Sequence, residues 1–392
     1  MKRIEDLKEI SQKKVLLRLD LNVPLKDGTI TDETRIIKIL PTLNYLLEKK
    51  AKIIIISHIG RPKGKFNSEL SMEPVRDNLE QKLNQKIKLF SEDILGITNK
   101  DLFKNFDGNI LILENIRFYS EEESNDLNFA NHLSTLGDIY INDAFSCSHR
   151  AHASVANITK FLPSYAGIQL NSEIKALEKV TINIEKPITC IIGGSKISTK
   201  IGMIENLIPK FDNIVIVGAM ANNILSYENV LIGKSVHEKD CNKIIKKIFE
   251  KSKQHSCSII YPEDVITGKN TNGKPVVKDL NEIENDDMIL DIGPKTIKNI
   301  NKLIDLSKTI LWNGPAGYFE NPNFANGSYE IAKSIVKNFK SNSIYSVAGG
   351  GDTIALLNKV NVFNEFNFVS TAGGAFLEYL EGKDLPGISA LN

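Results

Sequence analysis

The feature that most constrains the fold is an alternation of short strand-like runs with longer stretches of helical spacing. Runs rich in Ile, Val and Leu predict strands at 15–19, 52–56, 110–113 and 139–141 in the first half, and at 188–192, 214–217, 259–261, 288–291, 309–312, 343–347 and 366–369 in the second. The stretches between them carry apolar residues at the spacing of amphipathic helices. This alternation is typical of parallel βαβ units, so both halves are predicted to be doubly wound α/β domains.

The length of the chain indicates two domains. Its 392 residues are about two to three times the usual domain length. The stretch 171–180 has helical spacing and lies midway along the chain, between Pro163 and Pro187. It predicts a connecting helix between the domains rather than a flexible linker.

Composition excludes several classes of protein. Apolar residues make up 42% and charged residues 25%, which is an ordinary globular mixture. The longest aliphatic run, 53–56, is too short to span a bilayer, and Glu5 and Asp6 stand where a signal peptide would be apolar. We therefore expect a cytoplasmic protein. A net charge of +1 gives no reason to expect a nucleic acid or a membrane as partner, and four widely spaced cysteines favour reduced thiols over a zinc site.

Arginine is distributed unevenly. The 49 basic residues include only seven arginines, and none follows Arg150. Because lysine supplies most of the positive charge, the arginines are candidates for sites that need a planar, two-pronged donor to carboxylate or phosphate. The first 150 residues are thus predicted to be the anion-binding half.

The residues after the predicted strands carry the chemistry, because parallel sheets bind ligands at the carboxyl ends of their strands. In the first half these segments supply Asp, Asn, His and Arg; they are 20–24, 57–62, 114–117 and 142–150. In the second half they are rich in glycine; they are 193–196, 218–220, 293–294, 313–315, 349–353 and 372–374. Glycine at a strand-to-helix turn lets an anion approach backbone N–H groups, although such a turn also uses glycine for geometry alone. Asp20 and Asn22 share one face of an extended segment, but an ordinary turn cap would also explain them.

Several motifs, taken together, closely resemble the phosphoglycerate kinase family. They are 18–24 (Arg-Leu-Asp-Leu-Asn-Val-Pro), 57–62 (Ser-His-Ile-Gly-Arg-Pro), 114–118 (Glu-Asn-Ile-Arg-Phe), 193–196 (Gly-Gly-Ser-Lys) with Lys200, 312–315 (Trp-Asn-Gly-Pro) followed by Gly317, Phe319 and Glu320, and 349–353 (Gly-Gly-Gly-Asp-Thr). The match runs in order along essentially the whole chain, to 385–387 (Leu-Pro-Gly).

The resemblance implies a role for each matching residue. The residues implied to surround 3-phosphoglycerate or 1,3-bisphosphoglycerate are Asp20, Asn22, Arg35, His58, Ile59, Gly60, Arg61, Arg117 and Arg150. Those implied to hold ADP or ATP are Lys196, Lys200, Asn313, Glu320, Gly350, Gly351, Asp352 and Thr353. Catalytic roles fall on Arg35, Lys196, Gly351 and Gly374, and Asp352 is the implied ligand of Mg2+.

The resemblance also implies the organisation of the molecule. It predicts two Rossmann-like domains, joined by a hinge helix at about 171–182 and separated by a cleft. The glycerate domain would comprise 1–170 and about 378–392, and the nucleotide domain 171–377. We expect a monomer that transfers the phosphoryl group directly, in line, after domain closure. Lys196 is expected in the first turn of the helix that follows 193–195, with Lys200 one turn further on the same face.

The sequence departs from the family pattern at two places, and two alternative functions remain open. Ala372 stands where the family often has glycine, and 217–220 is leaner in glycine than in many members. A dinucleotide-dependent dehydrogenase would share the sheet architecture, but the chain lacks Gly-x-Gly-x-x-Gly in its first βα unit, just as it lacks Gly-x4-Gly-Lys-Ser/Thr. A non-catalytic nucleotide-binding or adhesion role would require a decayed site, whereas every charged motif residue is present.

Overall fold

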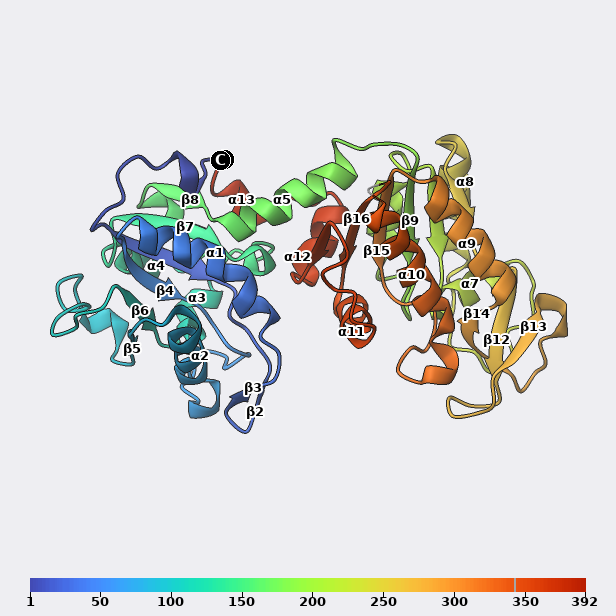
Figure 1. Cartoon of the computed structure of the whole chain (residues 1–392), viewed down its shortest axis with the longest axis horizontal. Coiled ribbons are helices and arrows are strands. Elements are labelled where there is room, and N and C mark those ends of the chain that lie inside the picture. The colour runs from blue at the N-terminus through green and yellow to red at the C-terminus, as the bar shows by residue number, and fades with distance from the viewer. Residues whose placement is uncertain (342) are drawn as a thin grey trace. The chain divides into compact units, whose positions relative to one another are not determined.

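The computed structural model describes residues 1–341 and 343–392, which form two compact units (Figure 1). The first comprises Met1–Lys175 and Asp384–Asn392, and the second comprises Ala176–Lys383. The chain passes from one unit to the other within helix α5 (Ile168–Thr181), which contains the predicted connecting helix. Residues 378–383, expected in the first domain, belong to the second unit.

The first unit is built on a six-stranded sheet in which all neighbouring strands are parallel. In spatial order the strands are β5 (Ile87–Phe90), β6 (Ile110–Leu113), β4 (Lys52–Ile56), β1 (Lys14–Leu19), β7 (Ile139–Asp143) and β8 (Ser164–Ala166). The four predicted strands of this half are confirmed; the short strands β5 and β8 were not predicted. A two-stranded hairpin, β2 (Leu25–Lys26) with β3 (Thr29–Ile30), lies outside this sheet.

Both faces of this sheet are buried, which explains why its strands are continuously aliphatic rather than alternating. Val15, Leu17 and Ile55 belong to one hydrophobic cluster with residues of α1 and α2, while the alternate residues Leu16 and Ile54 are buried as well. The helices of this unit are α1 (Thr34–Glu48), α2 (Glu73–Leu83), α3 (Ser120–Glu123), α4 (Leu127–Ser134) and α13 (Pro386–Ser389). Short 3-10 helices occupy Ile4–Asp6, Ser68–Leu70, Ile94–Gly96, Ile116–Phe118, Phe145–Cys147 and Asn157–Lys160.

The end of the chain packs within the first unit. The backbone N of Gly387 donates to the carbonyl of Ser148 at 2.8 Å, and Nδ2 of Asn142 donates to the carbonyl of Gly387 at 3.2 Å. A Cβ at Gly387 would lie 2.7 Å from a Val155 methyl group, so only glycine allows this close approach. The tail therefore ties α13 to the segments that follow β7.

The second unit contains a second six-stranded parallel sheet. In spatial order its strands are β11 (Ser258–Ile260), β10 (Asn213–Ile216), β9 (Ile188–Ile192), β15 (Thr309–Asn313), β16 (Tyr345–Gly349) and β17 (Phe368–Ser370). Each was predicted: β9 has the predicted ends, and the ends of the other strands shift by at most two residues. Ile191, Val215 and Ile310 pack in one cluster with residues of α9, α10 and α11.

One predicted strand belongs to a different sheet. The stretch 288–291 was expected to join the parallel series, but β14 (Met288–Ile292) pairs antiparallel with β12 (Asp264–Gly268), which also pairs antiparallel with β13 (Val276–Asp279). The seven residues between β12 and β13 are too few for the crossover that parallel pairing needs, so these two strands pair antiparallel and begin a separate sheet that β14 joins. Neither β12 nor β13 was predicted.

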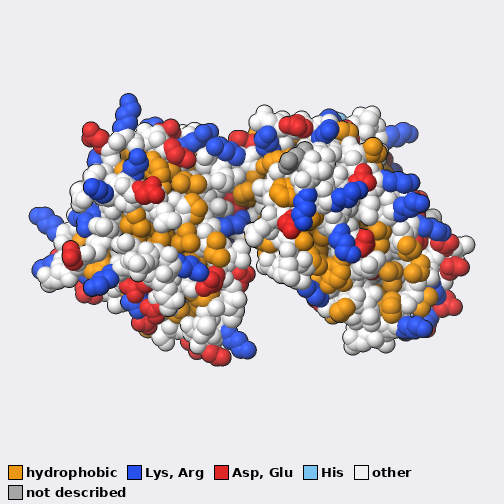
Figure 2. Space-filling model, viewed as in Figure 1, with side chains coloured by type: hydrophobic (Ala, Val, Ile, Leu, Met, Phe, Trp, Pro, Cys, Tyr) orange, Lys and Arg blue, Asp and Glu red, His pale blue; other side chains and the backbone are white. Residues whose placement is uncertain are grey.

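The helices of the second unit are α6 (Ile201–Leu207), α7 (Ala219–Tyr227), α8 (Asn242–Gln254), α9 (Pro294–Leu306), α10 (Asn326–Lys340), α11 (Gly351–Lys359) and α12 (Gly374–Leu380). Short 3-10 helices occupy Leu280–Glu282 and Pro322–Phe324. Across residues 1–341 and 343–392, no helix combines the length and the apolar character needed to cross a membrane. On the face drawn in Figure 2, the surface of each unit intersperses Lys and Arg with Asp and Glu.

Candidate active site

The predicted residues of the first unit follow strands that are neighbours in its sheet. Strands β6, β4, β1 and β7 lie side by side and run parallel, so their carboxyl ends meet at one edge. The residues that follow them are Arg117 after β6, His58, Ile59, Gly60 and Arg61 after β4, Asp20 and Asn22 after β1, and the segment that leads to Arg150 after β7.

A chain of hydrogen bonds joins five of the predicted residues. Nη1 of Arg35 donates to Oδ1 of Asp20 at 2.8 Å and to the backbone carbonyl of Asn22 at 3.0 Å. Oδ1 of Asn22 accepts from the backbone N of Gly60 at 2.9 Å, and the carbonyl of Gly60 accepts from Nη1 of Arg117 at 3.0 Å. Gly60 has φ +64°, a conformation that residues with a side chain rarely adopt. Asp20 and Asn22 therefore orient Arg35 and the turn after β4.

Arg117 is a buried cation with donor capacity to spare. Its side chain is 5% exposed, and its Nε has no hydrogen-bond partner among the described residues; Oε1 of Glu123 lies 3.6 Å away. Burial lowers the pKa of Arg117, and the nearby Arg18 and Arg150 add to this effect, but a guanidinium remains charged at any physiological pH. A buried donor without a partner is costly, so an anion bound here would stabilise it.

His58 is held in its neutral form. Its side chain is buried, and burial lowers the pKa of the imidazole well below its ordinary value; Arg18, Arg117 and Arg35 lower it further. Above that pKa the ring has one N–H and one lone pair. It can therefore donate a hydrogen bond to a substrate oxygen without adding a charge.

Besides His58, three predicted residues lie outside this chain of hydrogen bonds in the part of the protein that the structure describes. Ile59 is buried, and its carbonyl accepts from Nδ2 of Asn115 at 2.8 Å. Arg61 is exposed, next to Gly60. Arg150 is half-buried, and its Nε donates to Nε2 of His149 at 3.1 Å.

In the second unit, three helices begin at glycines in left-handed or otherwise uncommon conformations. Gly218, Gly350 and Gly373 are the N-caps of α7, α11 and α12, with φ of +67°, +103° and +55°. None of these caps supplies a side-chain hydrogen bond. The first backbone N–H groups of a helix have no partner within it, and they carry the positive end of its dipole, so these ends can receive an anion.

A cavity of about 360 Å³ lies where α11 and α12 begin. Its lining includes most of the predicted nucleotide residues together with the glycines that follow β9, β15, β16 and β17: Gly193, Gly194, Lys196, Lys200, Asn313, Gly314, Gly350, Gly351, Asp352, Thr353, Gly373 and Gly374. A Cβ built at Gly351 or Gly373 meets no atom within 4 Å, so both backbones are open to a ligand. Two cations and many backbone N–H groups thus face one space, as phosphate binding requires.

Side-chain hydrogen bonds connect the ends of the strands that line this cavity and hold its walls in place. Nζ of Lys200 donates to Oδ1 of Asn313 at 2.7 Å, and Nδ2 of Asn313 donates to the carbonyl of Gly349 at 2.6 Å. Oγ1 of Thr353 accepts from the backbone N of Gly314 at 2.7 Å and donates to the same Gly349 carbonyl at 3.0 Å. Burial lowers the pKa of Lys200, while Asp352 opposes this change.

The expectation that Lys196 lies in the first turn of a helix is wrong. The helix α6 begins at Ile201, with Lys200 as its N-cap, so Lys196 lies in the preceding loop and the two lysines do not share a helical face. Ser198 explains why the helix begins later in the sequence than predicted: its backbone N and Oγ donate to the carboxylate of Glu238 at 2.9 and 2.5 Å. Thr199 also donates to the carbonyl of Lys196 at 2.8 Å, which favours a turn.

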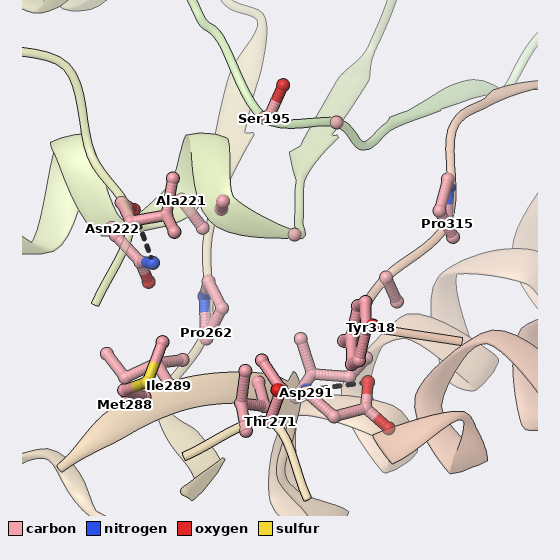
Figure 3. Close-up of a pocket in the computed structure, with 18 of the residues that line it drawn as sticks. Ser195, Ala221, Asn222, Pro262, Thr271, Met288, Ile289, Asp291, Pro315 and Tyr318 are labelled. Atoms are coloured by element: carbon pink, nitrogen blue, oxygen red, sulfur yellow. Dashed lines mark hydrogen bonds between the residues drawn. The ribbon is translucent and has the colours of Figure 1, made fainter. Parts of the chain in front are cut away.

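A second cavity, of about 320 Å³, adjoins the first and shares Gly194, Ser195 and Asp352 with it (Figure 3). Its lining is mainly apolar and includes Ala219, Ala221, Pro262, Met288, Ile289, Leu290, Pro315, Ala316 and Tyr318. Figure 3 shows Ser195 on one side of the cavity and Met288 and Ile289 on the other. Glu320 is exposed and also belongs to the lining. An apolar slot beside a phosphate-binding cavity suits a nucleoside.

Sequence reasoning missed most of this second cavity. Pro262, Thr271 and Val236 come from loops that carry no phosphate motif, and the sequence of 288–290 indicates only a strand. Because β14 lies in a sheet that the sequence did not predict, no local pattern placed these residues near Gly194. The asymmetry between an arginine-rich edge and a glycine-rich edge, by contrast, was visible in the sequence.

Comparisons with known proteins identify the family. A family model described as "Phosphoglycerate kinase" matches residues 4–383. The chain belongs to the phosphoglycerate kinase family. It is 47% identical to the phosphoglycerate kinase of Wolbachia pipientis wMel over 386 residues, covering 98% of this chain and 96% of that protein. It is 43% identical to that of Chelativorans sp. (strain BNC1) over 392 residues, covering 100% and 98%.

Solved phosphoglycerate kinases share the fold along the whole chain. The structure of phosphoglycerate kinase from Coxiella burnetii has a TM-score of 0.91 at 38% identity, covering 99% of this chain and 98% of that one. The enzyme from Pyrococcus horikoshii OT3 has a TM-score of 0.82 at 29% identity, covering 100% and 98%. The two-domain α/β fold predicted from the sequence is confirmed, and the dehydrogenase alternative is wrong. As a member of this family the chain is a glycolytic phosphotransferase with a carboxyl group as acceptor, and one of its substrates is a nucleotide.

Proposed function

We propose that the first unit binds 3-phosphoglycerate or 1,3-bisphosphoglycerate and that the second binds ADP or ATP. The observation that carries the proposal is the division of chemistry: guanidinium and imidazole groups gather at one sheet edge, whereas glycine-capped helices and two adjoining cavities occur at the other. The proposed glycerate ligands are Asp20, Asn22, Arg35, His58, Ile59, Gly60, Arg61, Arg117 and Arg150. The proposed nucleotide ligands are Lys196, Lys200, Asn313, Glu320, Gly350, Gly351, Asp352 and Thr353.

The roles of these groups follow from their chemistry. Arginines suit the substrate's carboxylate and phosphate because a planar fork donates two parallel hydrogen bonds. Backbone N–H groups and Lys200 suit the nucleotide phosphates, and the apolar cavity suits the base. Glu320, at the cavity lining, is available to a ribose hydroxyl.

Transfer itself needs charge compensation and alignment rather than a nucleophilic side chain. The acceptor, a carboxylate or a β-phosphate oxygen, is already anionic, so no general base is required. We assign Arg35, Lys196 and the backbone N–H groups of Gly351 and Gly374 to the transferring phosphoryl group, where charge must be neutralised. Direct in-line transfer requires the two bound substrates to meet, so the proposal includes closure of the units around them, which excludes water.

Asp352 fits a site for Mg2+. It is an exposed carboxylate in the first turn of α11, and it lines both cavities, so it can reach a nucleotide phosphate group. Mg2+ is usually held by one or two carboxylates together with substrate phosphates and water. When bound, the ion would neutralise phosphate charge; the chain's own contribution is to hold the carboxylate beside the backbone N–H groups of the helix.

The acidic cluster Glu284, Asp286 and Asp287 is a weaker candidate for that ion. Nζ of Lys269 lies within 3.0 Å of a carboxylate oxygen of each of the three, and Lys278 contacts Asp287 at 2.8 Å. These two lysines already offset two of the three negative charges of the cluster. We also propose that the protein is a monomer in the cytoplasm and has no nucleic-acid or membrane partner, as expected for a glycolytic enzyme with small substrates.

The test is a coupled assay for ATP formation from 1,3-bisphosphoglycerate and Mg-ADP by the full chain. Binding measured separately for 3-phosphoglycerate and for ADP then tests the division between units, because Arg117→Ala should weaken only the first and Lys200→Ala only the second. If the enzyme turns over but each variant weakens binding of both ligands, the assignment of ligands to the two units is wrong, although the proposed activity stands.

A further inference from the structure

Arg18 is a buried arginine that contacts the proposed site only through His58. It belongs to β1 and is 0% exposed, so none of its surface is available to a substrate. Its Nη2 lies 3.2 Å from Nδ1 of His58, which extends from the end of the neighbouring strand β4. The remaining donors are also occupied: Nε donates to Oγ of Ser154 at 2.9 Å, and Nη1 donates to the carbonyl of Leu19 at 2.7 Å.

This contact determines which nitrogen of His58 carries the proton. A guanidinium has five N–H donors and no acceptor. If Nδ1 carried a proton, two N–H groups would face each other at 3.2 Å in a buried site, and the sulfur of Cys147, 4.0 Å from Nδ1, is only a weak acceptor. The contact is a hydrogen bond only if Nδ1 offers its lone pair, so the proton is on Nε2. The same reasoning excludes the imidazolium, in which both nitrogens are donors.

We propose that Arg18 is a positioning residue that fixes His58 as the neutral Nε2–H tautomer, so that Nε2 donates to an oxygen of the anionic glycerate substrate. The inference rests on the proposed function for the identity of that anion. The carboxylate and phosphate oxygens of the substrate only accept hydrogen bonds. The opposite tautomer would present a lone pair to them, which is repulsive.

A second buried charge keeps Arg18 in place. Glu122 is 0% exposed; its Oε1 accepts from Oγ of Ser154 at 2.6 Å and its Oε2 accepts from the backbone N of Ser154 at 2.8 Å. The single hydroxyl proton of Ser154 therefore points to Glu122, and its lone pair accepts from Arg18. The hydroxyl thus links a buried cation to a buried anion, which is how a protein retains such charges.

The other groups around His58 also favour a neutral ring with a lone pair on Nδ1. Arg117, Arg35 and His152 all disfavour a positive charge on the ring, as does its burial. The sulfur of Cys147 lies 4.0 Å from Nδ1, and a thiol is a weak donor, so it too is compatible with a lone pair there. Every described neighbour is consistent with one protonation state.

Nitrogen-15 NMR of the histidine-labelled full chain tests the tautomer without any substrate. We expect a pyridine-type Nδ1 and a pyrrole-type Nε2 for His58, assigned by its loss in His58→Gln. The double variant Arg18→Met/Glu122→Gln removes both buried charges together, and it should shift both nitrogens toward averaged values as the tautomers mix. Arg76→Met, the same exchange on the surface of α2, should leave the spectrum of His58 unchanged. A protonated Nδ1 in the wild-type protein would overturn the proposal even if the double variant fails to fold.

Calorimetric titration with 3-phosphoglycerate tests the donation. A glutamine amide reaches the position of Nε2 and an asparagine amide that of Nδ1, so His58→Gln should retain affinity better than His58→Asn by on the order of tenfold, the value of a hydrogen bond to a charged group. Equal, large losses in both variants would overturn the donation from Nε2. Affinity unchanged in both would instead remove His58 from the proposed function, while the spectrum alone would still decide the tautomer.

Discussion

Nζ of Lys200 donates to Oδ1 of Asn313 at 2.7 Å, and so a lysine at the start of α6 is held by the end of β15. The amide of Asn313 also donates to the carbonyl of Gly349, at the end of β16. One side chain therefore orients both a cation and the backbone that leads into Gly350 and Gly351. This explains how a half-buried lysine, with a pKa lowered by burial, is kept facing the cavity.

Replacing that amide should weaken nucleotide binding. Asn313→Ala leaves Lys200 without its acceptor, and we expect affinity for ADP to fall by about tenfold or more, since hydrogen bonds to charged groups contribute about 1.5–3 kcal/mol. Calorimetric titration with ADP measures the change. Asn358→Ala, at an exposed position of α11, is the control. Wild-type affinity in Asn313→Ala would show that Lys200 needs no support from β15.

Arg150→Lys should weaken binding of the glycerate substrate although the charge is kept. An ammonium cannot donate two parallel hydrogen bonds to one anionic group, so we expect the KM for 3-phosphoglycerate to rise by about tenfold. Arg76→Lys, in which the arginine forms surface ion pairs with Glu73 and Asp77, is the matched control. A KM equal to that of the wild type would exclude Arg150 from the ligand set.

Asp352→Asn should raise the Mg2+ concentration required for half-maximal activity and leave affinity for 3-phosphoglycerate nearly unchanged. The reason is that the carboxylate is the charged ligand of the proposed ion, whereas the glycerate ligands belong to the other unit. Titration of activity with Mg2+ and of binding with 3-phosphoglycerate gives both values. Asp286→Asn, whose carboxylate contacts Lys269 at 2.6 Å, should change neither. An equal loss for both ligands would contradict the assignment to the nucleotide unit.

The sheets could be predicted, and so could the sheet edges that carry the candidate site residues, because the causes are local. A strand such as β4, with four consecutive isoleucines, needs burial on both faces, and this pattern is visible within five residues. The glycines at 193–194, 349–351 and 373–374 likewise mark strand-to-helix turns by their spacing alone. The prediction of an anion-binding first half rests on the distribution of arginine, and four of the seven arginines are among the proposed glycerate ligands.

What could not be predicted depends on contacts between distant residues. The start of α6 was misplaced because Ser198 is held by Glu238, forty residues later. Arg18 lies within the motif 18–24, but the sequence indicates no role for it, because its burial and its contact with His58 exist only once β1 and β4 are paired. The sheet that contains β14 was missed for the same reason: its partner β12 has no alternation that separates it from a loop or a parallel strand.

The buried His152 should make the stability of the first unit depend on pH. It is 6% exposed, and burial together with Arg117, Arg18 and Arg150 lowers its pKa to about 3. In the unfolded chain a histidine has a pKa of about 6.5, so between pH 6.5 and 3 unfolding takes up a proton and stability falls as the pH falls. Glu122, whose pKa is raised by burial, acts in the opposite direction, so the effect is isolated by a variant rather than by the wild type alone.

His152→Gln should flatten this dependence. The loss of one proton taken up on unfolding corresponds to a decrease in slope of about 1.4 kcal/mol per pH unit, measured by urea unfolding between pH 6 and 4 relative to the wild type. His255→Gln makes the same exchange at an exposed position and is the control. A slope unchanged by His152→Gln would mean that this histidine is protonated in the folded protein.

Arg35 and Lys196 should matter for turnover more than for binding. Arg35 is held by Oδ1 of Asp20 and the carbonyl of Asn22, in a position set by β1 and α1, while Lys196 is exposed in the loop between β9 and α6. If both act on the transferring phosphoryl group, their charges are needed most when charge is redistributed during transfer. An interaction made mainly in the transition state changes kcat rather than KM. We therefore expect Arg35→Ala and Lys196→Ala each to lower kcat by on the order of a hundredfold or more, as for other lost transition-state charge contacts.

Because Lys196 is not on a helix, its loss disturbs no helical packing, so Lys196→Ala is the variant whose effect is easier to interpret. Arg76→Ala and Lys253→Ala remove surface charges of the same kind and should leave kcat unchanged. Steady-state kinetics with both substrates saturating decides the matter: a kcat within a few-fold of the wild type would remove that residue from the catalytic role, and a large rise in KM at constant kcat would make it a ligand of the ground state only.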